Sequence, residues 1–98
     1  LQDLGDAASA RPLLERALVI VEAVYGPDHP DVATGLNNLA TVLQDLGDAA
    51  SARPLLERAL VIAEAVHGPD HPVVATVLHN LAMLLRDVGD TGGGSAVA

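Results

Sequence analysis

Apolar residues recur along this chain at intervals of three and four, which is the spacing of one face of an α-helix. Polar and charged residues fill the positions between them, so each stretch has one apolar and one polar face. Glycine and proline interrupt the pattern, and the uninterrupted stretches predict four helices, at residues 7–25, 30–46, 49–67 and 72–88. The residues expected to face inward in the middle two helices are Val32, Leu36, Leu39, Ala40, Leu43 and Leu46, then Ala52, Leu55, Leu56, Ala59, Ile62 and Val66.

Two kinds of short turn separate the predicted helices. In one, Gly47 has the place of a glycine that ends a helix, and Asp48 is positioned to cap the next helix. In the other, Gly68 and a proline end the helix, and Asp70 is expected to cap the helix whose first turn contains Pro72. Connections this short place consecutive helices antiparallel, so the pattern predicts an all-α fold.

The whole pattern repeats every 42 residues. Residues 1–42 return as residues 43–84 with seven substitutions, and a third copy opens with LRDVGD before the sequence changes to TGGGSAVA. A fixed period of this size indicates a stacked array of helical repeats. We expect one repeat domain over residues 1–90, divided into a partial repeat 1–30, a full repeat 31–67 and a half repeat 72–90, and a disordered tail or linker over residues 91–98. The opening LQDLGD has the sequence of a repeat's end, which suggests a fragment of a longer array.

Composition narrows the possible partners. The net charge is −8, with five arginines and no lysine, which disfavours nucleic acid and anionic membrane surfaces. No apolar run approaches the length of a membrane span. The chain contains no cysteine, so it suits a reducing compartment, and we expect a cytoplasmic protein.

No residue pattern in the chain predicts catalysis, a metal or a cofactor. His29 and His71 occupy identical turns and are expected to shape the start of a helix, with Asp28 and Asp70 beside them as caps. His67 lies four residues before His71, but a glycine and a proline between them argue against a metal pair. The three consecutive glycines near the end lack the lysine of a phosphate-binding loop.

The residues also carry a family resemblance. The run GPDHPDVATGLNNLA, followed by LGD and PLLERAL, resembles the 42-residue tetratricopeptide repeats of kinesin light chain, and similar arrays occur in bacterial signalling proteins behind a nucleotide-binding or other effector domain. Periods near 42 also fit HEAT or armadillo arrays, but the Leu-Gly-Asp turn and the alanine pattern favour the tetratricopeptide interpretation. The resemblance implies a right-handed solenoid of four helices in which leucine replaces the usual core aromatics.

The function implied by the resemblance is a non-catalytic protein-interaction scaffold. In such arrays the first helix of each pair lines a concave groove that binds an extended peptide. Asn38 and Asn80 are the strongest candidates, because an amide both donates and accepts hydrogen bonds; the alternative is that each amide pairs with a neighbouring helix. The complete predicted groove set is Thr34, Asn37, Asn38, Thr41, Gln44, Asp45, Thr76, His79, Asn80, Met83, Arg86 and Asp87.

The acidic composition favours a neutral or basic peptide as the partner. Two alternatives remain open at this point. In the first, the chain is a self-assembly module whose uncapped end helices stack between copies to form a homo-oligomer. In the second, it is the regulatory array of a larger signalling ATPase or other effector.

Overall fold

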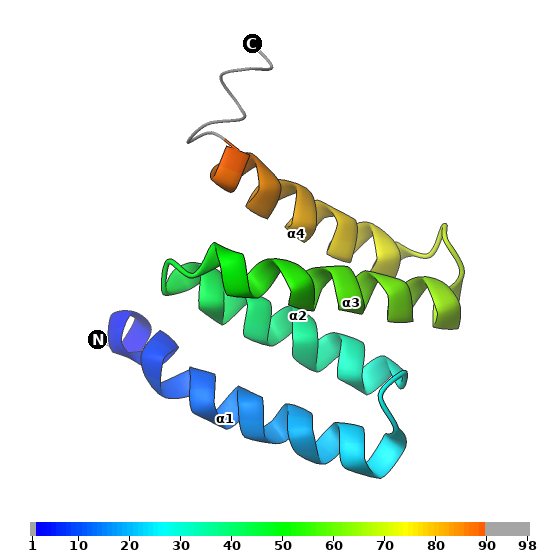
Figure 1. Cartoon of the computed structure of the whole chain (residues 1–98), viewed down its shortest axis with the longest axis horizontal. Coiled ribbons are helices and arrows are strands. Elements are labelled where there is room, and N and C mark those ends of the chain that lie inside the picture. Colours follow the sequence, from blue (N-terminus) through cyan, green and yellow to red (C-terminus); the bar gives the residue numbers. More distant parts are fainter. Residues whose placement is uncertain (1, 90–98) are drawn as a thin grey trace.

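A computed structural model describes residues 2–89, with side chains for residues 6–87. Its four helices are α1 (Gln2–Tyr25), α2 (Pro30–Asp45), α3 (Ala49–His67) and α4 (Pro72–Gly89). Each helix packs mainly against its neighbours in the chain, so α1 contacts α2, α2 contacts α3 and α3 contacts α4. Figure 1 shows α1 and α4 at the two edges of this stack, with α2 and α3 between them. The all-α helical-repeat fold predicted from the sequence is therefore confirmed.

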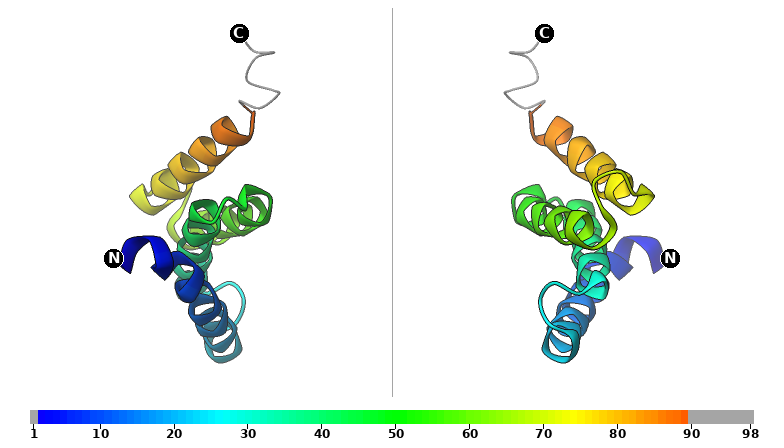
Figure 2. Two further views of the ribbon diagram at one scale, coloured as in Figure 1. Left: turned by 90° about the vertical axis from the view of Figure 1, so that its left-hand side faces the viewer. Right: turned by 90° about the vertical axis from the view of Figure 1, so that its right-hand side faces the viewer.

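The predicted helix boundaries agree with the observed ones to within one residue, with one exception. The first helix was expected to begin at residue 7, whereas α1 begins at Gln2 and continues through the first Leu-Gly-Asp sequence. Figure 2 shows that these first turns, drawn in the darkest blue, run at an angle to the rest of α1. The predicted tail at residues 91–98 lies outside the described residues.

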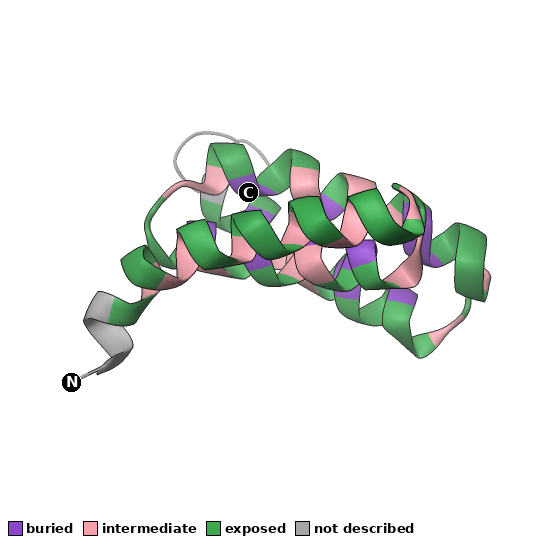
Figure 3. Cartoon of the chain, turned by 90° about the horizontal axis from the view of Figure 1, so that it is seen from below, coloured by how far each residue is buried: buried purple, intermediate pink, exposed green. Residues whose placement is uncertain are grey.

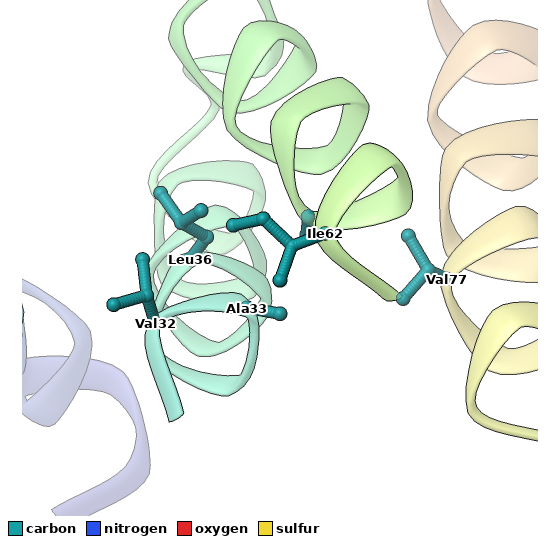
Figure 4. Close-up of a cluster of buried hydrophobic side chains, with 6 residues drawn as sticks. Val32, Ala33, Leu36, Ile62 and Val77 are labelled. Carbon is teal, nitrogen blue, oxygen red and sulfur yellow. The ribbon is translucent and has the colours of Figure 1, made fainter. Parts of the chain in front are cut away.

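Two clusters of buried apolar side chains form the core. Ten of the twelve residues in the two clusters come from α2 and α3, and α4 supplies the other two, Val77 and Leu84. Figure 4 shows Ile62 directed from α3 toward Leu36 and Ala33 of α2, with Val77 of α4 on the other side. The first cluster consists of Val32, Ala33, Leu36, Ala59, Ile62 and Val77, and the second of Leu39, Ala40, Leu43, Ala52, Leu56 and Leu84.

Two residues expected in the core are exposed instead. Leu46 is 39% exposed because it is the cap residue beyond the last turn of α2. Val66 is 44% exposed because the last turn of α3 extends past the start of α2, its antiparallel partner. Ala63, one turn earlier, is buried in its place.

The helix caps confirm one prediction and correct another. The Asp48 carboxylate accepts a hydrogen bond from the Ser51 amide at 3.2 Å, as expected for a cap of α3. At α2 and α4, however, histidine performs this role instead of Asp28 and Asp70. Nδ1 of His29 accepts from the Asp31 amide and Nδ1 of His71 accepts from the Val73 amide, both at 3.0 Å. The physical reason is that a proline occupies the first position of each helix, so the residue directly before it is the cap.

Gly47 makes the tight reversal between α2 and α3 possible. Its φ angle is +83°, a left-handed conformation that glycine adopts without strain. In this turn the Asp48 amide donates to the Leu43 carbonyl at 2.7 Å and the Gly47 amide donates to the Gln44 carbonyl at 2.9 Å. The turn therefore satisfies the last carbonyls of α2 and holds α3 against it.

Candidate functional site

A pocket of about 200 Å³ opens where the first halves of α2 and α4 meet the last turns of α3. Helices α2 and α4 are the first helices of two successive pairs, so the pocket bridges two repeats. Its lining residues are Pro30, Ala33, Thr34, Asn37, Ala63, His67, Val73, Thr76 and Val77.

The walls of the pocket are mainly aliphatic, and its polar groups come from hydroxyl, amide and imidazole side chains. Ala33, Ala63 and Val77 are all buried and provide a close-packed base. The hydroxyls of Thr34 and Thr76 donate to carbonyls one turn earlier in their own helices, at 3.4 and 3.2 Å. Each threonine oxygen therefore remains able to accept a hydrogen bond from a ligand.

A side-chain hydrogen bond joins the two helices that carry the predicted groove residues. Nδ2 of Asn80 donates to Oδ1 of Asn37 at 2.9 Å, which places α2 and α4 side by side beside the pocket. The Asn80 amide on α4 therefore pairs with a residue of α2. This is the alternative to peptide binding that the sequence left open for Asn80. The bond uses only one donor and one acceptor, so the pair retains the NH₂ group of Asn37 and the carbonyl oxygen of Asn80.

The other predicted groove residues occupy different parts of the molecule. Thr34, Asn37 and Thr76 line the pocket, whereas Asn38 and His79 are exposed outside it. Gln44, Asp45, Arg86 and Asp87 lie at the far ends of α2 and α4, roughly 10–15 Å along the helix axis from the pocket residues. There Arg86 and Asp87 form an exposed ion pair at 3.5 Å. Thr41 is exposed and donates to the Asn37 carbonyl at 3.0 Å, and Met83 is half-buried.

Six pocket residues were absent from the sequence-based set: Pro30, Ala33, Ala63, His67, Val73 and Val77. The sequence nevertheless contained a signal for most of them. The two copies differ at seven positions. At five of these positions, the residue from one of the two copies lines the pocket. These five residues are Asn37, Ala63, His67, Val73 and Val77.

One of these differences also has a packing reason. A Cβ atom on Gly35, the counterpart of Val77, would lie 3.2 Å from Cδ1 of Leu18, so glycine allows α1 to approach α2 closely. Val77 instead fills the core between α3 and α4. His67 and Val73, by contrast, are exposed residues at the rim, where core packing does not dictate the side chain.

The histidines form aromatic stacks at the turns. The rings of His67 and His71 lie 4.3 Å apart with an interplanar angle of 23°, and Tyr25 stacks on His29 in the same way at 4.4 Å. The Nδ1 atoms of His29 and His71 are engaged in capping, which confirms their expected structural role. Among residues 2–89 no group of three or more potential ligands is arranged to hold a metal ion.

Arginine and glutamate side chains link elements on the outer surface. Arg58 of α3 forms an ion pair with Glu22 of α1 and also donates to the Pro27 carbonyl at 3.2 Å. Two further pairs join residues four apart on one helix, Arg11 with Glu15 and Arg53 with Glu57, both at 3.2 Å. No helix within the described range is both long and apolar enough to cross a membrane.

Comparison with known families agrees with this architecture. The family model described as tetratricopeptide repeat matches residues 1–43 and again residues 31–92. The chain therefore belongs to the tetratricopeptide repeat family, whose members generally act as protein-interaction scaffolds and are typically non-catalytic. No curated protein matches the chain.

Proposed function

We propose that this protein binds an extended segment of a partner protein across the face formed by α2 and α4, without catalysis. The observation that carries the proposal is the pocket between α2, α3 and α4, at which five of the seven differences between the repeats converge. Near-identical repeats have the same packing requirements at most positions. Core packing does not dictate the exposed rim residues His67 and Val73, so the differences at these two positions favour a role in recognition over a role in stacking.

The amide pair beside the pocket supports binding to a peptide backbone. The free NH₂ group of Asn37 donates and the free carbonyl oxygen of Asn80 accepts, which is the complement of the carbonyl and amide of one peptide group. Such contacts are independent of the ligand's side chains. Selectivity then comes from the pocket, where Ala33, Ala63 and Val77 favour an aliphatic side chain.

Charge favours a neutral or basic ligand. The chain carries a net charge of −8, and Asp45 and Asp87 lie exposed on the same two helices as the pocket. Only two helices contribute to the face, so the contact area is small and the dissociation constant should be about micromolar or weaker.

We also propose that the repeats are of the kinesin light chain type. The 42-residue period and the repeated GPDHP turns support the kinesin light chain type of repeat. Arrays of this type in bacterial signalling proteins accompany an effector domain, so we propose that the chain recruits or regulates such a domain in the cytoplasm. Sequencing the parent gene on both sides of this region tests that context directly.

The groove hypothesis is testable by exchanging pocket residues for those of the other repeat. After selection of a ligand from a peptide array, His67→Tyr and Val73→Asp restore the residues found at positions 25 and 31. Both side chains are exposed, so the fold should survive, and we expect each variant to weaken binding about tenfold or more. Asn80→Ala should weaken binding of all ligands similarly, because it removes a backbone contact.

Arg53→Ala on the outer surface of α3 is the matched control and should leave affinity unchanged. Asn38→Ala separates the two asparagines, since Asn38 lies exposed outside the pocket. Binding that survives both pocket exchanges and Asn80→Ala would contradict the groove. Binding lost on replacement of Arg16 or Arg58 would assign recognition to the opposite face.

A further inference from the structure

The flank of α2 that faces away from the pocket differs in chemistry from the matching flank of α4. On α4 this flank forms one wall of the pocket, through Val73, Thr76 and Val77. The positions that match them on α2 carry Asp31, Thr34 and Gly35. A carboxylate and a bare backbone position therefore replace two valines. Thr34 also lines the pocket, so it lies on the ridge between the two flanks of α2.

Three side chains meet beside this second flank of α2. The ring of Tyr25, the last residue of α1, stacks on the ring of His29 with centroids 4.4 Å apart. The Asp31 carboxylate lies 3.9 Å from Nδ1 of the same histidine. Figure 3, which views the molecule from the α1 side, shows exposed residues along α1, and Tyr25 at its end is 56% exposed. The group therefore presents an aromatic ring and a carboxylate to solvent over a short distance.

The second repeat shows that the turn forms without either of these two side chains. There His67 takes the place of Tyr25 and stacks on the next histidine at 4.3 Å. Valine takes the place of Asp31, although an acidic residue in the first turn favours a helix. Helix α4 nevertheless begins with the same kind of histidine cap as α2. The phenol ring and the carboxylate are therefore available for recognition.

A repeat placed before α1 would leave both positions open. Their counterparts His67 and Val73 are exposed at the rim of the pocket, although α2 lies beside them. Positions 25 and 31 would lie at the rim of an equivalent pocket in a longer array, and they lie on open surface without one. In both cases the ring and the carboxylate are accessible from the side on which the pocket opens.

The charge of Asp31 is not neutralised by its neighbours. Nδ1 of His29 accepts the Asp31 amide proton, so this nitrogen has no proton to share with the carboxylate. Arg58 reaches the same turn through the Pro27 carbonyl, but its charge is paired with Glu22. In the described part of the chain no arginine forms an ion pair with Asp31. The carboxylate is therefore available to a cation from a ligand.

We propose that Asp31 and Tyr25 form a cation site, which binds a lysine or arginine of the partner segment while an aliphatic residue of the same segment fills the pocket. This binding mode rests on the proposed function and adds a second point of recognition to it. The stem of the basic side chain lies on the Tyr25 ring and its charged end pairs with Asp31. The segment has to cross α2 over Thr34, about 10 Å, which an extended chain spans with about three residues.

A spacing scan tests the cation site. The probes are serine peptides of about eleven residues with a central leucine as the anchor, in which a single lysine occupies each other position in turn. Titrations followed by amide shifts in NMR measure affinity down to the millimolar range. We expect binding to peak at a spacing of about three residues. There lysine should bind about three- to tenfold more tightly than glutamine, and high salt should remove most of the difference.

Exchanges between the repeats assign the preference for lysine to the cation site. Asp31→Val and Tyr25→His introduce the residues of the equivalent positions in the second repeat, so both variants should fold. Asp31→Val should remove most of the preference for lysine over glutamine, and Tyr25→His should reduce it about twofold. Asp28→Asn is the matched control. It removes the same charge from the same turn at a residue that precedes α2, and it should leave the preference unchanged.

The results for the cation site and for the pocket are distinguishable. Binding that Val73→Asp weakens, but that shows no preference for lysine at any spacing, would overturn the cation site and leave the pocket as the ligand site. A lysine preference that survives Asp31→Val, or a preference for glutamate at the same spacing, would overturn it as well. Binding that is unchanged by Val73→Asp, or no binding of any leucine-anchored peptide, would contradict the proposed function and the cation site together.

Discussion

Helices α1 and α3 share an identical run, residues 7–20 and 49–62, and yet have different environments. Residues 1–20 and 43–62 are identical, yet Ile20 is 52% exposed and its counterpart Ile62 is 2% exposed. Ala17 is exposed, whereas Ala59 is fully buried. The cause lies in their neighbours, because α3 packs between α2 and α4 and α1 packs against α2 alone. An amphipathic stripe therefore specifies which face can be buried, and the position in the stack specifies whether it is.

The largest expected difference concerns the leucines that face α2. Leu56→Ala should lower the free energy of unfolding by about 2–5 kcal/mol, because Leu56 is fully buried and its removal leaves a cavity. Leu14→Ala, at the half-buried counterpart, should have less than about half that effect. Urea denaturation followed by circular dichroism measures both values. Equal losses would show that α1 and α3 are equally packed.

Enlarging the equivalent alanines, Ala59 and Ala17, should also change stability by different amounts in the two helices. Ala59→Leu forces a larger side chain into a filled helix contact and should destabilise the protein by about 1–3 kcal/mol. Ala17→Leu adds the same atoms at an exposed site, where we expect a change within about 0.5 kcal/mol. The same denaturation series provides the measurement. A large loss from Ala17→Leu would indicate that the side chain at position 17 is covered in solution.

The two glycines of the Leu-Gly-Asp sequences should respond with opposite sign. Gly47 has φ +83°, so Gly47→Ala introduces backbone strain of about 1–2 kcal/mol. The counterpart Gly5 lies within α1, where Gly5→Ala should stabilise by about 0.5–1 kcal/mol or less, through higher helix propensity. The measured changes in unfolding free energy should therefore differ in sign. If both substitutions destabilise, residues 4–6 form a turn in solution.

The smallest effect concerns the arginines of the two helices. Arg58→Ala removes the partly buried contact with Glu22 and should lower stability by about 0.5–1 kcal/mol. Arg16→Ala should have no measurable effect in dilute solution, because Arg16 makes no ion pair in the described part of the chain. An Arg58→Ala variant as stable as the parent would show that the ion pair is energetically neutral.

The sequence predicted the helices and their inward faces well because both depend on local information. Side chains three and four apart share a helix face, and proline, glycine and aspartate mark the ends within a few residues. The errors occurred where position relative to another helix matters. Leu46 and Val66 continue an apolar stripe but lie beyond the end of the partner helix, so nothing covers them.

The candidate site was predicted only in part, for a related reason. Thr34, Asn37 and Thr76 were found because they lie on the exposed face of the first helices. Ala63 and His67 were missed because they come from the last turns of α3, which helical periodicity assigns to a different element. The clustering of repeat differences around one pocket became visible only when the three helices were placed together.

By itself the sequence determined the repeat, the helices, the stripe on each and the turn residues that end them, because these depend on contacts within one or two helical turns. Tertiary structure decided which of two identical stripes is buried and which histidine and asparagine side chains have partners. It also decided whether the backbone of the Leu-Gly-Asp sequence forms a turn or a helix. Gly47 turns because α2 precedes it and offers the carbonyls of Leu43 and Gln44 to the turn amides. The same residues at 4–6 lie within α1 and are helical.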